Sequence, residues 1–194
     1  MHATTVSAGT IQSQLKGVNS GATTRWQERL IRYRKTIDNL VVDITNPYQI
    51  STAERAALAV RIKHANMAIY RCQSADNIDP DGLTALAAQL GLGVPDRNLC
   101  ADEDGLSKIQ VEKISARQRY IPYTNKPLNW HTDGYYHTPD RIIRTMLLHC
   151  VRPARHGGTL EAMDHEIIYG LLREQHPRLA EALCRPDAMT IPEN

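Results

Sequence analysis

The chain has 194 residues, 42% of them hydrophobic and 23% charged, and its 23 Lys and Arg against 21 Asp and Glu give a net charge of +2. This composition excludes an intrinsically disordered or collagen-like chain, and the near-neutral charge argues against a polyanion-binding protein. No apolar run approaches the roughly 20 residues of a membrane helix, and the N-terminus lacks the apolar segment of a secretory signal. We therefore expect a cytoplasmic protein of one domain, or one and a part, with no nucleic-acid or membrane partner.

The cysteines support this expectation. Cys72, Cys100, Cys150 and Cys184 form no CxxC or CxxxC pair, so a structural zinc site built on cysteines is not expected. Free thiols in a cytoplasmic protein are the interpretation we favour.

The N-terminal part of the chain predicts a leader, a helix and a strand. Residues 1–22 are small and polar without a hydrophobic period, which is typical of a flexible leader. Over residues 25–35, apolar residues recur every three or four positions among basic ones, which predicts an amphipathic helix with a solvated basic face. The apolar run at 40–44, which precedes an Asn-Pro pair, predicts a short strand.

Two further helices have recognisable first residues. Ser51, with Glu54 three positions later, has the pattern of a capping box, and an apolar stripe at helical spacing follows it. The Asp-Pro pair at 79–80 combines a cap residue with proline at the first helical position, and Gly91 ends that helix. Between these helices, residues 67–70 are compatible with a last helical turn or with a buried strand.

The second half of the chain predicts both strands and helices. Alternation over 109–113 predicts a strand, and the apolar run at 142–151 predicts a core strand. Asp164 caps a predicted helix, and Pro177 begins another. Strands interleaved with helices after residue 40 predict a mixed α+β fold.

The segment most informative about chemistry is 130–136, which reads WHTDGYY. On an extended strand, residues i and i+2 point to the same face, so His131 and Asp133 would present an imidazole nitrogen and a carboxylate oxygen side by side. These are two of the three ligands in the 2-His-1-carboxylate triad that binds non-haem Fe(II). An HxD pattern alone is equally compatible with an exposed polar strand.

Other short segments accompany this motif. They are Tyr123-Thr124 before it, Tyr135-Tyr136 at its end, and then LLHC at 147–150, Gly157-Gly158 and Asp164. Together with the order of the earlier helices, they resemble the TauD/TfdA superfamily of taurine dioxygenase-like Fe(II)/2-oxoglutarate oxygenases, and most closely its γ-butyrobetaine hydroxylase-like branch. The resemblance extends over residues 40–194.

This resemblance implies a double-stranded β-helix, a jelly roll of two facing sheets with flanking helices. The chain would hold the N-terminal part of that domain over residues 23–194, after the leader at 1–22. The implied protein is an oxidoreductase that uses Fe(II) and the cosubstrate 2-oxoglutarate to hydroxylate a small organic substrate, with release of succinate and CO2. By match to the family motif, His131 and Asp133 would be iron ligands.

The resemblance assigns roles to two more residues. Thr159 follows the double glycine directly and would help to hold 2-oxoglutarate, although the family often has one residue between, so a plain loop hydroxyl is the alternative. Tyr123 has the spacing to His131 of an aromatic residue that binds a trimethylammonium group in the γ-butyrobetaine branch, through cation–π attraction. The alternative for Tyr123 is a core position in a chain without Phe.

The same region admits a different metal site. On a continuing strand, His137 would share a face with His131 and Asp133, which would give a three-ligand site such as a metal hydrolase uses. The following residues Thr138-Pro139 indicate, however, that the strand ends there.

The sequence departs from the family pattern toward its C-terminal side. The family places a second histidine ligand on a later strand, followed by an arginine that pairs with the distal carboxylate of 2-oxoglutarate. Here the last histidine, His176, lies in a predicted helical region, so we expect both residues to be missing and the chain to be catalytically incomplete. Besides a small-molecule substrate, the partners we consider are further copies of the chain in a homo-oligomer or a complementing C-terminal chain. The alternative is a non-catalytic remnant or binding module that pairs with a second chain.

Overall fold

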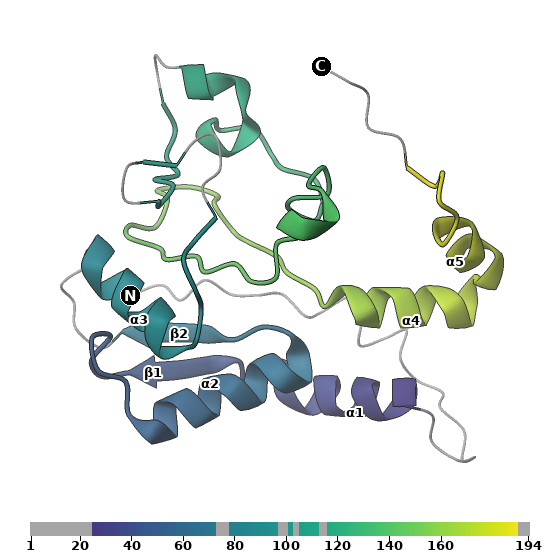
Figure 1. Cartoon of the computed structure of the whole chain (residues 1–194), viewed down its shortest axis with the longest axis horizontal. Helices are drawn as coiled ribbons and strands as arrows, with labels where there is room; N and C mark the ends of the chain where they lie inside the picture. The colour runs from purple at the N-terminus through teal and green to yellow at the C-terminus, as the bar shows by residue number, and fades with distance from the viewer. Residues whose placement is uncertain (1–24, 73–77, 97–100, 103–104, 113–115, 190–194) are drawn as a thin grey trace. The chain divides into compact units, whose positions relative to one another are not determined.

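The computed structural model of the chain describes residues 25–72, 78–96, 101–102, 105–112 and 116–189 (Figure 1). The predicted leader at 1–22 lies outside the described residues. The chain divides into two compact units. The first unit combines the residues up to 46, the segment 50–76 and the residues from 150 onward, and the second combines 47–49 with 77–149.

A strand–helix–strand arrangement forms one part of the first unit. Strands β1 (Val41–Ile44) and β2 (Ile69–Cys72) pair in parallel, with Val41 opposite Ile69. Parallel neighbours require a crossover connection, and α2 (Thr52–Ala65) lies within it, alongside the strands in Figure 1. The predicted strand at 40–44 is thus confirmed, and the ambiguous segment at 67–70 leads into a second strand.

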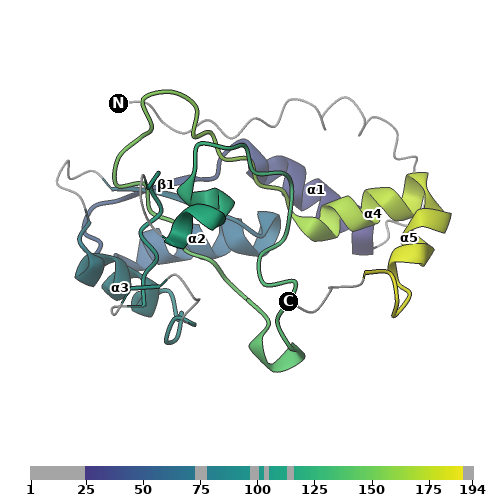
Figure 2. The ribbon, with the colours of Figure 1, turned by 90° about the horizontal axis from the view of Figure 1, so that it is seen from above.

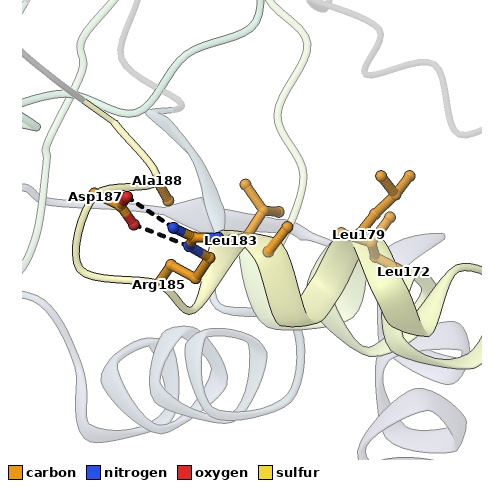
Figure 3. Close-up of a pocket in the computed structure, with 7 residues that line it drawn as sticks. Leu172, Leu179, Leu183, Arg185, Asp187 and Ala188 are labelled. Atoms are coloured by element: carbon orange, nitrogen blue, oxygen red, sulfur yellow. Dashed lines mark hydrogen bonds and ion pairs between the residues drawn. The ribbon is translucent and has the colours of Figure 1, made fainter.

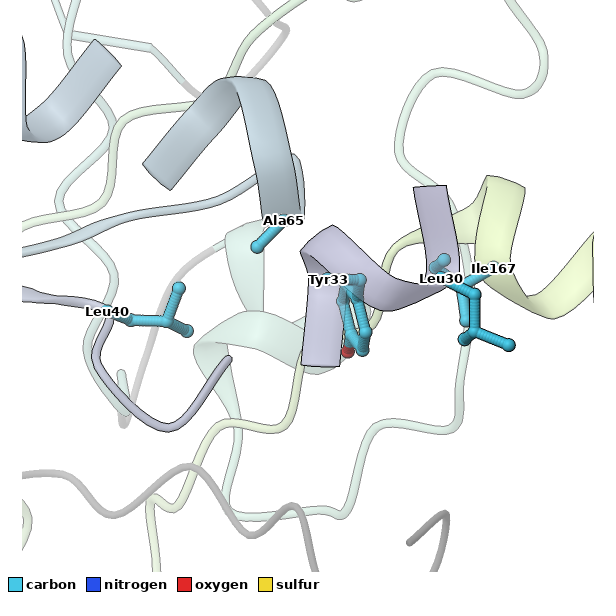
Figure 4. Packing of buried hydrophobic residues seen from close by; sticks show 5 residues of the cluster. All are labelled: Leu30, Tyr33, Leu40, Ala65 and Ile167. Atoms are coloured by element: carbon cyan, nitrogen blue, oxygen red, sulfur yellow. The ribbon is translucent and has the colours of Figure 1, made fainter. Parts of the chain in front are cut away.

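Three more helices belong to the first unit: α1 (Arg25–Ile37), α4 (His165–Gln175) and α5 (Pro177–Leu183). Helices α1 and α4 lie side by side in two perpendicular views (Figures 1 and 2). A core that joins α1, α2 and α4 contains five buried residues: Leu30, Tyr33, Leu40, Ala65 and Ile167 (Figure 4). The amphipathic helix predicted near the N-terminus is confirmed, because Leu30 and Tyr33 are its two buried residues.

Contact between α1 and α4 depends on a glycine and an ion pair. A Cβ atom at position 170 would overlap the indole ring of Trp26, so glycine at this position permits the close approach. Nearby, the Arg29 guanidinium lies 2.6 Å from Asp164 Oδ2 and 2.7 Å from Glu166 Oε2. Asp164 is buried and also caps α4 by accepting the N–H of Glu166.

The predicted capping box of α2 is confirmed. The Ser51 hydroxyl accepts the N–H of Glu54 at 3.2 Å, and Glu54 Oε2 accepts the N–H of Ser51 at 2.7 Å. The other carboxylate oxygen of Glu54 accepts the N–H of Thr45 at 2.8 Å, which ties the helix start to the end of β1. These backbone donors stabilise the ionised carboxylate and lower the pKa of Glu54 to about 2.

Within its described residues, the second unit contains one α-helix and three short 3-10 helices. Helix α3 (Pro80–Gln89) begins where predicted, and Asp79 caps it by accepting the N–H of Gly82 at 2.7 Å. The 3-10 helices are Ala116–Arg119, Ile121–Tyr123 and Pro139–Arg141. Loops and turns connect them.

Two predicted strands do not form in the described part of the chain, which leaves out residue 113 at the end of the first of them. Ile109 and Val111 are exposed in a loop, and the segment 142–151 lies in no helix or strand, with most of its apolar side chains exposed. A strand requires a neighbouring strand to complete its hydrogen bonds, and the only strand pairing among the described residues is that of β1 with β2. The mixed α+β class is confirmed, whereas the jelly roll stays a prediction. Of the helices in the described part of the chain, none has the length and apolar character needed to cross a membrane.

Candidate functional site

His131 and Asp133 lie in a loop of the second unit, between the 3-10 helices at 121–123 and 139–141. Their side chains are neighbours, with 3.5 Å between His131 Nε2 and Asp133 Oδ1. The expected juxtaposition is therefore present, although strand alternation does not produce it. Residues 131–132 have no regular structure, and a turn begins at Asp133. Both side chains are partly exposed, so a ligand can reach them from solvent.

A backbone contact determines which nitrogen of His131 is available. Nδ1 of His131 lies 2.7 Å from the carbonyl oxygen of Asn129. A carbonyl oxygen can only accept, so Nδ1 carries the hydrogen and donates it. In the neutral ring, Nε2 then has the free lone pair, and this is the atom beside Asp133. Metal-binding histidines commonly have this arrangement, in which the second ring nitrogen donates to a carbonyl or carboxylate.

The separation of the two atoms is compatible with a shared metal ion. Metal–ligand bonds of about 2.0 to 2.2 Å place neighbouring ligand atoms roughly 3 to 3.5 Å apart, depending on the coordination angle. His131 Nε2 and Asp133 Oδ1 lie 3.5 Å apart, and each atom can donate a lone pair to a cation placed between them. The donor set, one imidazole and one carboxylate, suits Fe(II) or another divalent transition metal.

His137 does not complete a three-ligand site. In the described part of the chain, no three His, Cys, Asp or Glu side chains come together in a group that could hold a metal ion. Nδ1 of His137 instead lies 2.9 Å from the carbonyl oxygen of Arg141. The alternative of a hydrolase site built from His131, Asp133 and His137 is therefore wrong for this structure, because the turn after Asp133 replaces the continuing strand that the alternative required.

Tyr123 is buried at the end of its 3-10 helix, and a cation of the protein already lies over its ring. The Arg117 guanidinium carbon is 5.7 Å from the ring centroid, and Arg117 also pairs with Asp102 at 2.9 Å and Glu112 at 3.7 Å. The hydrogen bond from Arg117 lowers the pKa of the Asp102 carboxyl. Tyr123 thus has the environment of a core position and also a cation–π contact, and its role toward a substrate stays a prediction.

Thr159 is exposed in the first unit, in the loop between Gly158 and α4. Glycine is required at its two preceding positions, because Gly157 and Gly158 have φ angles of +68° and +73°. The role of Thr159 toward 2-oxoglutarate also stays a prediction.

A hollow of about 520 Å³ lies along α4 and α5 (Figure 3). Leucine and alanine side chains line it, and the ion pair of Arg185 with Asp187 lies at one end. None of the predicted site residues is among those that line it. Its lining also lacks the convergent polar groups that a cofactor site needs.

Sequence patterns missed the two charge clusters described above. Arg117 is 15 residues from Asp102, and Arg29 is 135 residues from Asp164. No periodicity connects such residues, because tertiary folding alone brings them together. For Asp164, the pattern indicated a helix cap but gave no sign of its buried ionic partner.

Comparison with known proteins defines the class. The family model described as "Taurine catabolism dioxygenase TauD, TfdA family" matches residues 33–194. The chain therefore belongs to the TauD/TfdA family, as the HTD motif and its neighbouring segments indicated.

Uridine-5'-phosphate dioxygenase from Streptomyces sp is 30% identical to the chain over 104 residues. This match covers 53% of the chain and 38% of the relative, so the matched region spans well under half of the relative's length. No solved structure matches the chain significantly.

Proposed function

We propose that the chain forms part of an Fe(II)- and 2-oxoglutarate-dependent oxygenase that hydroxylates a small organic substrate and releases succinate and CO2. The observation that carries this proposal is the pair of His131 Nε2 and Asp133 Oδ1, 3.5 Å apart, in a chain of the TauD/TfdA family. Iron with 2-oxoglutarate, when bound, would supply the oxygen chemistry. We propose the jelly roll as the fold of the whole protein, and a cytoplasmic location for it.

The residues of the chain would hold and orient the metal. His131 would bind through Nε2, while its Nδ1–H donates to the carbonyl of Asn129 and keeps the ring in one orientation. Asp133 would supply the negative charge that a divalent cation requires. Thr159 would contribute a hydroxyl toward 2-oxoglutarate in the assembled site.

The metal ion would need further ligands besides His131 and Asp133, and the described residues provide no third ligand beside this pair. We propose that a further part of the protein or a second chain supplies the second histidine and the arginine for 2-oxoglutarate. Two ligands alone would bind a divalent cation weakly, since affinity depends on a preorganised ligand set.

A metal-binding experiment tests the ligand assignment without relying on turnover. Mn²⁺ binding, followed by electron paramagnetic resonance, is expected to be weak but measurable in the chain and to be lost in His131→Ala and in Asp133→Ala. His165→Ala is the matched control, because His165 is exposed at the start of α4 and should leave binding unchanged. Binding that survives both site substitutions would refute the assignment.

Turnover is tested by measuring succinate release from 2-oxoglutarate with Fe(II), for this chain and for a lengthened protein. Release by the lengthened protein that disappears with His131→Ala would support the proposal. Because the relative is named for uridine-5'-phosphate, that compound belongs among the candidate substrates, together with a sulfonate and a quaternary ammonium compound. Metal binding without succinate release in the lengthened protein would favour the alternative of a non-catalytic binding module.

A further inference from the structure

In the sequence, exposed aromatic residues come directly before and after the candidate metal pair. The chain has 8 Tyr, 2 Trp and no Phe, yet three of these rings, Trp130, Tyr135 and Tyr136, lie in the short segment 130–136. They are 63%, 54% and 60% exposed. Large aromatic rings usually bury much apolar area in cores and interfaces, so three exposed rings within three positions of two potential metal ligands are candidates for a binding surface.

The turn after Asp133 holds two of these rings in place. The N–H of His137 donates to the carbonyl of Gly134 at 2.9 Å, so Tyr135 and Tyr136 occupy the central positions of a β-turn. Gly134 has a φ angle of +68°, and a Cβ atom there would lie 2.7 Å from the side chain of Ile143. Glycine is therefore required at this position, and it sets the turn against Ile143.

The rings of the turn form a contiguous edge-to-face series. Ring centroids of Tyr135 and Tyr136 are 5.3 Å apart, and those of Tyr136 and His137 are 4.8 Å apart, with interplanar angles of 82° and 90°. This packing restricts the rings while leaving more than half of each tyrosine exposed. A planar ligand can stack on such a preorganised surface with little further loss of conformational freedom.

Charges around the segment favour an anionic ligand. Between residues 116 and 149, the acidic residues are Asp133 and Asp140, and the basic residues are Arg117, Arg119, Lys126, Arg141 and Arg144. Arg117 and Arg141 are paired with Asp102 and Asp96. The guanidinium of Arg119 lies over the ring of Tyr120. By contrast, Lys126 and Arg144 are exposed and form no ion pair within the described residues. This excess of positive charge would attract and retain an anion.

We propose that Trp130, Tyr135 and Tyr136 form a stacking surface for the substrate, and that the substrate is a planar aromatic molecule that carries an anionic group. This inference rests on the proposed function, since it identifies the substrate class of the same metal site. The ring would lie on the aromatic surface beside His131 and Asp133, and the anionic group would be held by the surrounding basic side chains.

Three simple probes separate the ring from the charge. Phenyl phosphate carries both, methyl phosphate carries the anion alone, and benzyl alcohol carries the ring alone. Isothermal titration with the full chain is expected to give phenyl phosphate an affinity at least about fivefold higher than either of the others, since stacking of one ring contributes on the order of a five- to hundredfold effect. Equal affinity for phenyl phosphate and methyl phosphate would overturn the proposal.

Matched variants locate the binding surface. Tyr136→Leu is expected to weaken phenyl phosphate binding about fivefold or more, and Tyr120→Leu, at another exposed tyrosine of the same unit, is expected to leave it unchanged. Trp130→Phe keeps a ring and should retain most of the affinity, but should remove the ligand-induced change in tryptophan fluorescence. Replacing both Lys126 and Arg144 by Gln removes two positive charges. It is expected to reduce the ratio of the affinity for phenyl phosphate to the affinity for benzyl alcohol. Circular dichroism checks that each variant is folded.

Two contrary results would be decisive. If Tyr136→Leu and Tyr120→Leu bind phenyl phosphate equally, the aromatic surface has no part in recognition. Iodide quenching of the fluorescence of Trp130 tests whether its ring is accessible to solvent. If iodide does not quench it, and if Tyr136→Leu also lowers the melting temperature, the rings are covered by another part of the protein or by a second copy. The proposal is then wrong. Mn²⁺ binding is measured separately, so that a failure of the metal assignment can be recognised. If phenyl phosphate binds to the aromatic surface but Mn²⁺ does not bind to the chain, the proposed function is refuted and the stacking surface is not.

Discussion

Glu54 shows how a single side chain can connect two elements. Its carboxylate accepts one N–H from Ser51 at the start of α2 and another from Thr45 after β1. Both donors stabilise the charged form, which is why the pKa of Glu54 falls to about 2 from an ordinary value of 4.5. The connection between strand and helix therefore depends on this carboxylate being ionised.

The pH dependence of stability follows from that direction of shift. A depressed folded-state pKa contributes stability that is present above the unfolded-state value and is lost as the pH falls toward the folded-state value. We expect the difference in melting temperature between the wild-type chain and Glu54→Gln to be constant above about pH 5 and to shrink between about pH 4.5 and about 2. Thermal unfolding followed by circular dichroism measures it.

Glu181→Gln, on α5, is the control for this experiment and should show no such dependence. If the difference in melting temperature between the wild-type chain and Glu54→Gln stays constant down to pH 2, the role assigned to the Glu54 carboxylate is contradicted. Ser51→Ala, which removes the other half of the capping box, is expected to lower the free energy of unfolding by about 1 kcal/mol at neutral pH.

Helices α1 and α4 are held together by one buried carboxylate with two functions. Asp164 caps α4 and pairs with Arg29 of α1, and its side chain is fully buried while that of Arg29 is 26% exposed. Removing one partner of such a pair leaves a charge that is only partly solvated. The α1–α4 contact should therefore be sensitive to position 164.

Two substitutions separate the cap from the charge. Asp164→Ala loses both, and we expect it to lower the free energy of unfolding by about 2 to 4 kcal/mol. Asp164→Asn removes the charge but keeps a capping oxygen, so it should lower the free energy of unfolding by roughly half as much as Asp164→Ala. Urea denaturation measures these differences, and Asp187→Asn, in the exposed pair with Arg185, should change the free energy of unfolding much less than Asp164→Ala does. Equal effects of Asp164→Ala and Asp187→Asn would contradict the buried-pair argument.

The elements that sequence patterns predicted correctly are those determined locally. The start of α2 at Ser51 and that of α3 at Asp79 depend on residues within three positions, and the stripe that buries Leu30 and Tyr33 depends on helical spacing alone. Segment 142–151 has the composition of a strand, but a strand also needs a partner, which local composition cannot provide. For the same reason, the closeness of His131 and Asp133 was predicted from strand geometry and arises from a turn.

At the scale of the whole molecule, the apolar side chains of 142–151 remain largely in contact with solvent. The matched region covers 38% of the relative Uridine-5'-phosphate dioxygenase, and the proposed jelly roll would cover this segment with further strands. An exposed apolar segment of this kind also favours association with another chain.

Hydrogen exchange should distinguish this segment from the helices. Backbone amides of 142–147 are expected to exchange within seconds in this chain, because this part of the segment lies in no helix or strand, whereas those in the middle of α4 should be protected. In a lengthened protein that completes the sheets, exchange in 142–147 should slow by at least about tenfold. Protection of 142–147 equal to that of α4 in this chain would contradict the expectation.

The contact between His131 and the carbonyl of Asn129 affects how this loop can vary among related sequences. Because a main-chain atom orients the imidazole, replacing the side chain at position 129 does not remove the partner. A histidine oriented by an aspartate would lose its partner through one point mutation. An insertion or deletion between 129 and 131 would instead move the carbonyl out of reach, so the length of this loop is under stronger constraint than the residue type at position 129.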